Sequence, residues 1–146
     1  MKSLIVEDDF TSRRLMQLYL MEFGDSNIAV DGHEVIDAFW KAVEENSPYD
    51  LICLDIMMPN MDGTEALWFI RQIESKHGIK PENGVKVIVT TAKQESQDVF
   101  GVYEAKYDAY LVKPIKQEEL VEEIKKLGLL EGSSTEVQTQ QSSGSV

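Results

Sequence analysis

The sequence has a single cysteine, few basic residues and no long apolar run. Cys53 is the only cysteine among 146 residues, which excludes an internal disulfide. Because Cys53 lies within a short apolar run, we interpret it as a small core residue rather than a nucleophile. Lys and Arg number 14 against 26 Asp and Glu, and the net charge of -12 argues against binding to nucleic acid or to an anionic membrane.

The sequence also lacks a segment that could cross a membrane. The first residues reach three acids directly after Val6, so they contain no apolar core of a signal peptide. The composition, 42% hydrophobic and 27% charged, is typical of one soluble globular domain. We therefore expect a reduced, cytoplasmic, single-domain protein whose partners are basic protein surfaces or cations.

Short apolar segments alternate along the chain with longer amphipathic ones. Apolar runs bounded by turn residues predict strands at 3–6, 27–30, 51–55, 85–91 and 109–112. Helical spacing of apolar residues predicts helices at 11–23, 34–45, 63–76, 95–106 and 116–127. Strict alternation requires right-handed crossovers and a parallel sheet covered on both faces. The predicted fold is α/β, a flavodoxin-like (βα)5 doubly wound parallel sheet of five strands in the order 2-1-3-4-5.

The same spacing predicts which side chains of each helix face the sheet. The residues expected to point inward are Leu15, Leu18, Tyr19 and Phe23, then Ile36, Phe39, Trp40 and Val43, then Ala66, Phe69, Ile70 and Ile73, then Val99, Val102 and Tyr103, and finally Leu120, Ile124 and Leu127. From Gly132 onward Ser, Thr, Gln and Gly dominate, and such a segment cannot bury enough apolar surface to order itself. We expect residues 1–127 to form the domain and residues 128–146 to be a flexible tail.

Chemically active side chains follow four of the predicted strands. The C-terminal ends of parallel strands meet at one edge of a sheet, so Glu7, Asp8, Asp55, Thr91 and Lys113 should converge there. Three carboxylates repel one another unless a cation neutralises them, and hard oxygen ligands suit Mg²⁺. The lysine adds a fixed positive charge and the threonine a hydrogen-bond donor. This set can stabilise an anionic tetrahedral group, such as phosphate, on or near Asp55.

Two local details accompany these residues. Thr90 precedes Thr91, and a one-residue shift in register would exchange the two hydroxyls; the following Ala92 favours Thr91. The sequence Lys113-Pro114 ends the last predicted strand, and we expect its peptide bond to be cis.

Four segments occur in the order and register of a known family: Val6–Asp9, Leu54–Gly63, Val89–Ala92 and Tyr110–Pro114. Together they resemble the bacterial response-regulator receiver domain. The resemblance covers about residues 1–127 and implies a phosphorylation switch that catalyses only its own phosphorylation and dephosphorylation. The implied phosphodonor is a phosphohistidine of a sensor histidine kinase or a histidine phosphotransfer protein, or a small phosphodonor.

The resemblance also implies a role for each residue of the site. Asp55 accepts the phosphoryl group. Asp8 binds Mg²⁺ directly and Glu7 binds it mostly through water, while the backbone carbonyl of Met57 completes the metal site.

The remaining implied roles concern the response to phosphorylation. Lys113 pairs with one phosphoryl oxygen and Thr91 moves to bond another. Tyr110 then turns inward as Thr91 leaves its first position. The face made by the fourth helix, fifth strand and fifth helix rearranges for a downstream protein target, as a monomer or as a phosphorylation-dependent dimer.

Other interpretations of the same residues stay open at this point. Glu7, Asp8 and Asp9 could simply cap the helix that follows, Asp55 could cap a turn, and Lys113 could be an exposed lysine. Because the residues converge as a set, we favour the functional interpretation, and we interpret both histidines, at positions 33 and 77, as surface residues.

The choice of protein class also has alternatives. We expect a stand-alone, chemotaxis-type receiver; the alternative is the N-terminal receiver of a longer regulator with an output domain. A second class is a Mg²⁺-dependent phosphohydrolase of the haloacid dehalogenase type, which needs a second acid where Met57 stands. A third is a degenerate receiver that binds partners without phosphorylation.

Overall fold

Five parallel strands form one sheet in the order β2-β1-β3-β4-β5. The strands are β1 (Ser3–Val6), β2 (Ser26–Ala29), β3 (Leu51–Asp55), β4 (Lys86–Thr91) and β5 (Ala109–Val112). This computed structural model describes residues 1–58, 63–92 and 107–130. The helix predicted at 95–106 lies outside these residues, as does the predicted tail beyond residue 130. The strand order and the parallel pairing confirm the predicted fold class.

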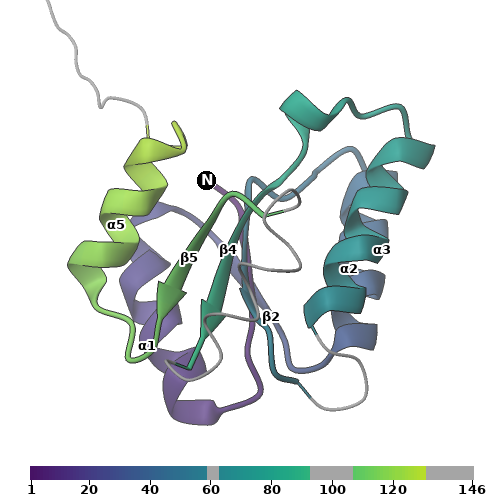
Figure 1. Cartoon of the computed structure of the whole chain (residues 1–146). Helices are drawn as coiled ribbons and strands as arrows, with labels where there is room; N and C mark the ends of the chain where they lie inside the picture. Colours follow the sequence, from purple (N-terminus) through teal and green to yellow (C-terminus); the bar gives the residue numbers. More distant parts are fainter. Residues whose placement is uncertain (59–62, 93–106, 131–146) are drawn as a thin grey trace, which may run out of the picture.

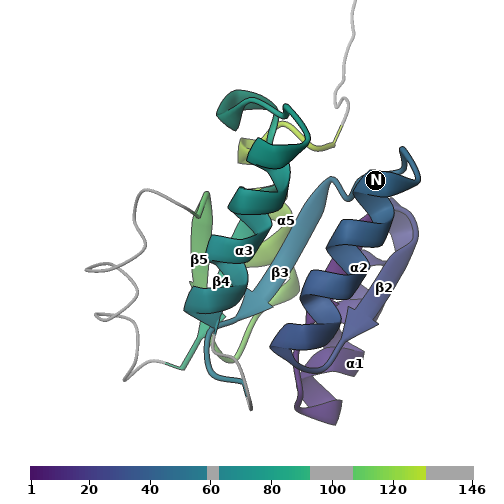
Figure 2. The same cartoon turned by 90° about the vertical axis from the view of Figure 1, so that its right-hand side faces the viewer.

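Helices cover both faces of the sheet (Figure 1). They are α1 (Phe10–Leu20), α2 (Gly32–Glu44), α3 (Gly63–Lys76) and α5 (Gln117–Lys126), with short 3₁₀ turns η1 (Met21–Phe23) and η2 (Pro81–Asn83). Figure 2 shows α2 and α3 on one face of the sheet and α1 and α5 behind it. None of the helices in the described ranges is long and apolar enough to cross a membrane.

Aspartate side chains fix where two of the helices begin. The Asp9 carboxylate accepts a hydrogen bond from the Ser12 amide at 2.9 Å, and that of Asp31 accepts one from the Glu34 amide at 2.9 Å. Each bond satisfies an amide of the first turn that has no partner within the helix. The predicted starts, residues 11 and 34, were therefore one and two residues late.

The strand side chains divide the core into two clusters. Alternate residues point to opposite faces of a strand, so Ile52 and Leu54 pack under α2 and α3, while Leu51 and Cys53 pack under α1 and α5. All five residues of β3 are buried, as the near-continuous apolar run predicted. Cys53 is 2% exposed, which confirms its interpretation as a core residue.

The predicted inward face of α1 was wrong for Leu15 and Leu18 and was confirmed for Tyr19 and Phe23. Met16 and Leu20 are the buried residues of this helix, while Leu15 and Leu18 are 42% and 47% exposed. Met16, Tyr19, Leu20 and Phe23 form a second stripe with the same helical spacing as the predicted one, and all four belong to the cluster under α1 and α5. Packing against the sheet selects between two stripes that are equally apolar in sequence.

Two more predicted core residues are exposed. Trp40 of α2 is 41% exposed and Phe69 of α3 is 38% exposed, whereas their helices bury Val35, Ala42 and Leu67 instead. The smaller side chains allow α2 and α3 to approach the sheet closely, and the large rings remain outside. The inward prediction was confirmed for Phe39, Ala66, Ile70, Ile73, Leu120 and Ile124.

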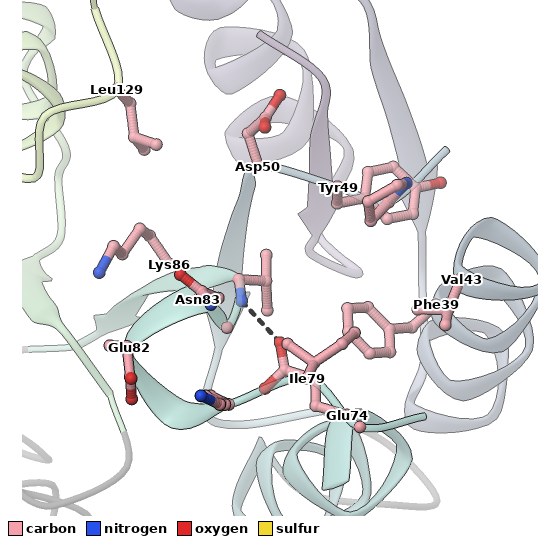
Figure 3. A pocket seen from close by; sticks show the side chains of 15 residues that line it. Phe39, Val43, Tyr49, Asp50, Glu74, Ile79, Glu82, Asn83, Lys86 and Leu129 are labelled. Carbon is pink, nitrogen blue, oxygen red and sulfur yellow. Dashed lines mark hydrogen bonds between the residues drawn. The ribbon is translucent and has the colours of Figure 1, made fainter. Parts of the chain in front are cut away.

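A buried glutamate fastens α3 to the start of β4. Glu74 is 4% exposed; its Oε2 accepts a hydrogen bond from the Val85 amide at 2.6 Å, and its Oε1 accepts one from Arg71 at 2.9 Å. The same guanidinium donates to the Val85 carbonyl oxygen at 2.9 Å. Figure 3 shows Glu74 at the wall of a hollow of about 520 Å³ that also has Phe39 and Lys86 in its lining. This hollow lies at the edge where the strands begin.

Gly24 permits the close approach of the first residue. Its φ of +136° is unfavourable for residues with a side chain, and a Cβ placed there would lie 2.0 Å from the Met1 carbonyl oxygen.

We expect Gly24→Ala to lower the free energy of unfolding by about 2–3 kcal/mol, measured by urea denaturation. Gly78→Ala is the matched control, with a φ of +72° and no described heavy atom within 4 Å of the added Cβ. The control should lose only about 1 kcal/mol; equal losses in the two variants would contradict the predicted clash.

Candidate functional site

Three carboxylates meet at the edge of the sheet where the strands end. Asp55 is the last residue of β3, and Glu7 and Asp8 directly follow β1, which pairs with β3. One oxygen of each carboxylate lies within 4.8 Å of one oxygen of the others. Glu7 and Asp55 are buried, while Asp8 is exposed. The structure therefore brings the three predicted acids together, and their oxygens form a donor set that can hold a hard cation.

Lys113 supplies the opposite charge. Its Nζ lies 2.8 Å from Glu7 Oε1 and 3.2 Å from Asp55 Oδ2, and its side chain is 26% exposed. The backbone amide of Lys113 donates to the Thr91 carbonyl oxygen at 2.8 Å, which continues the pairing of β4 with β5 up to the site. The Lys113–Pro114 peptide bond is cis, as predicted. The contact with Glu7 was not predicted, although both residues follow strands at the same sheet edge.

Backbone amides hold two of the acids. The Asp9 amide donates to Glu7 Oε2 at 3.1 Å, and the Met57 amide donates to Asp55 Oδ1 at 3.1 Å. The Met57 side chain is 58% exposed, so it makes little packing contact. Its backbone is the part of the residue that lies at the site. These bonds orient the carboxylates without using their remaining oxygen lone pairs.

Gly63 allows the start of α3 to lie close to the end of β3. A Cβ at this position would lie 2.7 Å from the Ile56 Cα, and the Gly63 amide donates to the Ile56 carbonyl oxygen at 2.9 Å. The start of α3 is thereby fixed against the end of β3. The predicted start of this helix, at residue 63, is confirmed.

Burial and charge change the acidity of the site. Desolvation by burial, and then the negative charge of Glu7, raise the pKa of Asp55 to about 7, although Lys113 and the Met57 amide act in the opposite direction. Burial would lower the pKa of Lys113, but its hydrogen bond to Glu7 and the charges of Asp55 and Glu7 outweigh that effect and raise the pKa. Lys113 is therefore positively charged, while Asp55 releases its proton near neutral pH.

The raised pKa of Asp55 predicts a pH-dependent stability. An aspartate in an unfolded chain has a pKa of about 3.9, so the folded protein binds this proton more tightly than the unfolded chain does. Stability should therefore fall as the pH rises from about 4 to about 7, and it should level off above that range. We expect this fall in chelator-treated wild type and a smaller one in Asp55→Asn, measured by urea unfolding between pH 5 and 8. Parallel pH profiles of the two proteins would contradict the assignment to Asp55.

The two threonines at the end of β4 face opposite sides of the sheet. Register places Thr90 directly beside Asp55, on the face of Cys53 and Ile88. Thr91 is fully buried and lies two residues after Val89, so it is on the same face of the sheet as Val89. Its hydroxyl donates to the Ala92 carbonyl oxygen at 3.2 Å. Sequence alone left these two residues open to exchange, and the register now distinguishes them. The role of Thr91 stays a prediction.

Tyr110 lies in β5 beside Val89 of β4. It is half-buried and packs against the cluster under α2 and α3. Its predicted inward turn stays a prediction.

The family model of the response regulator receiver domain matches residues 3–125. The chain belongs to this family. Because the match spans most of the chain, the four motifs, the strand order and the acidic edge all fall inside one receiver domain. The haloacid dehalogenase alternative is not favoured, since the position two residues after Asp55 carries no acid.

Relatives of this receiver include bacterial regulators and plant kinases. The transcriptional regulatory protein ResD of Bacillus subtilis is 39% identical over 127 residues, which are 86% of this chain and 47% of ResD. Probable histidine kinase 2 of Oryza sativa subsp. indica is 32% identical over 134 residues, which are 85% of this chain and 12% of the kinase. The chain thus spans about half, or much less, of the length of these curated relatives.

Solved receiver structures share the fold. The receiver domain of the histidine kinase CKI1 from Arabidopsis thaliana, solved with Mg²⁺ and BeF₃⁻, is 26% identical with a TM-score of 0.69; the alignment covers 87% of this chain and 89% of that one. The bacteriophytochrome response regulator RtBRR is 26% identical with a TM-score of 0.73, over 92% of this chain and 82% of that one.

Proposed function

We propose that this receiver is a phosphorylation switch of a two-component or phosphorelay system, with Asp55 as the phospho-acceptor. The observation that carries the proposal is the position of one buried carboxylate, Asp55, between two further acids and the ammonium of Lys113. A carboxylate with only a structural role would not require both a cation site and a lysine ammonium within 3.2 Å. Phosphoryl transfer does need both, because negative charge is present on the acceptor and on the donor.

The donor set at the site fits Mg²⁺. Three carboxylate oxygens are hard ligands, and the exposure of Asp8 leaves positions for water, which Mg²⁺ commonly retains. Asp8 and Asp55 would bind the ion directly, Glu7 through water, and the Met57 carbonyl would complete the set. When bound, Mg²⁺ supplies positive charge that neutralises the acids and the phosphoryl oxygens. The Mg²⁺ and BeF₃⁻ bound to the CKI1 receiver support this choice of metal.

The residues of the chain perform the transfer by orientation and charge. An oxygen of Asp55 attacks the phosphorus of a phosphohistidine, and the P–N bond breaks with its electron pair going to the imidazole nitrogen. The Met57 amide holds the other end of the carboxylate in place. Lys113 neutralises charge on the phosphoryl group as the acyl phosphate forms. The protein thus acts on itself and not as an enzyme that turns over a substrate.

The response is proposed to pass from the site to β5. The acyl phosphate adds acceptor oxygens that recruit the Thr91 hydroxyl, and Tyr110 turns inward in response. The face that includes β5 and α5 then binds a downstream protein target, either as a monomer or as a dimer formed on phosphorylation. We place the protein in the cytoplasm, with a sensor histidine kinase or a histidine phosphotransfer protein as the phosphodonor and residues 1–127 as the working unit.

The test is the intact mass of the full chain after incubation with acetyl phosphate. We expect one phosphate adduct when Mg²⁺ is present and none when a chelator replaces it. An unmodified wild-type protein that also fails to bind beryllofluoride would overturn the proposal in favour of a receiver that signals without phosphorylation. Sustained release of phosphate from a phosphomonoester would instead favour hydrolysis.

A further inference from the structure

Thr90 is a buried hydroxyl residue in a place that sheet packing alone would fill with an apolar side chain. In the sheet it pairs in register with Asp55 on one side and Leu111 on the other, and only 4% of its surface is exposed. Strand alternation puts Thr90 on the same face as Glu7, Asp55 and Lys113. The residues two positions before each of these on the same face are apolar and belong to the cluster under α1 and α5. An apolar side chain would therefore pack there equally well.

The Thr90 hydroxyl makes no hydrogen bond to any residue in the described part of the chain. A buried hydroxyl without a partner destabilises the folded protein, and buried polar side chains are therefore nearly always bonded to protein or to water. The hydroxyl of Thr90 thus requires a partner that is not a protein atom.

Thr90 is one of the residues that line a small cavity. Its volume is about 70 Å³, and the residues with polar groups in its lining include Glu7, Ser12, Thr90 and Lys113, with Met16 and Ile115 among the apolar walls. One water molecule needs roughly 10–15 Å³ of such space, so a few waters fit, and a water in this place needs two or more polar partners. The cavity therefore has both the size and the polar groups of a hydration site.

Lys113 provides the second partner of that water. A lysine ammonium has three donors, and two of those of Lys113 are directed to Glu7 and Asp55. The third is available to an acceptor in the cavity that Lys113 lines. One water can accept that proton and bond the Thr90 hydroxyl, which satisfies both groups.

We propose that the cavity between α1 and the end of β5 holds ordered water, and that Thr90 is a positioning residue that holds the Lys113 ammonium through it. The functional part of this inference rests on the proposed phosphorylation of Asp55. Thr90 would contact neither the metal ion nor the phosphoryl group. Its effect is to keep Lys113 in the place where charge develops during transfer.

The experiment compares the rate of phosphorylation by acetyl phosphate in the full chain for three variants. Thr90→Val keeps the shape and removes the hydroxyl, and we expect its rate to fall about threefold to tenfold, the factor that corresponds to one lost hydrogen bond. Thr90→Ser keeps the hydroxyl and should remain within about twofold of wild type. Ser3→Ala is the matched control, since Ser3 is a buried hydroxyl on the same face at the other end of β1 and should leave the rate unchanged.

A structural measurement separates this inference from the proposed function. A high-resolution crystal structure of the wild type should show a water within hydrogen-bond distance of Thr90 Oγ1 and Lys113 Nζ. The absence of that water, or a Thr90→Val rate equal to that of wild type, would overturn the inference. If the wild type is not phosphorylated at all, the proposed function fails, and the crystal structure alone then decides whether the water is present.

Discussion

We expect Asp55→Asn to abolish phosphorylation by acetyl phosphate, because the variant has lost the carboxylate proposed as the nucleophile. The amide has the shape of the carboxylate, so the hydrogen bond from the Met57 amide to the remaining oxygen can persist. It carries no negative charge and cannot form an acyl phosphate. Intact mass of the variant and of wild type, in the presence of Mg²⁺, measures the loss directly.

The control for this variant is Asp37→Asn. Asp37 is exposed on α2 and is not one of the three acids that meet at the site, so its replacement should leave the adduct at the wild-type level. Peptide mapping of the wild type should locate the phosphate on the peptide that contains residue 55. If another acid of the chain is labelled equally well in Asp55→Asn, the assignment of the acceptor is wrong.

Lys113→Met should reduce phosphorylation by about 10²–10³, the usual effect of removing one fixed charge that stabilises a transition state. Methionine fills a similar volume but leaves Glu7 and Asp55 without their ammonium partner. Chelator-treated protein should therefore lose about 1–3 kcal/mol of its free energy of unfolding at pH 8, less than a fully buried ion pair because Lys113 is 26% exposed. Affinity for Mg²⁺ should rise, since the competing cation has been removed.

Lys116→Met is the matched control for the lysine. Lys116 is exposed and precedes α5 without an ion pair to any described residue, so neither the phosphorylation rate nor the Mg²⁺ affinity should change. Lys113→Arg keeps the charge and tests whether position also matters. A Lys113→Met variant that is phosphorylated as fast as wild type would contradict the role of this ammonium in transfer.

The sheet and its functional edge could be predicted because each depends on a local pattern. β3 is an apolar run that ends in Asp55, and the run, the acid and the turn that follows occur together in the sequence. Parallel pairing then brings the ends of different strands together whatever the loops between them. The site required only the order of the strands and the residue at the end of each one.

The faces of the helices could not be predicted with the same rule. In α1 two apolar stripes overlap, and only the sheet distinguishes buried Met16 from exposed Leu15. The ion-pair partners within the site could not be predicted either, because the contacts of Lys113 with both Glu7 and Asp55 depend on side-chain distances. The cavity beside Thr90 is a property of packing between α1 and the end of β5, and no pattern of residue types marks it.

The shared position of Lys113 makes two binding equilibria interdependent. Its ammonium is an internal counter-ion of Glu7 and Asp55, so a metal ion bound to Asp55 would compete with it for that carboxylate, and a phosphoryl group on Asp55 would give the ammonium a new anion to bind. By thermodynamic linkage, whatever the metal adds to the affinity for the anion, the anion adds to the affinity for the metal. We therefore expect this one lysine to couple cation binding to phosphorylation; in the structure its ammonium offsets part of the negative charge of the three acids.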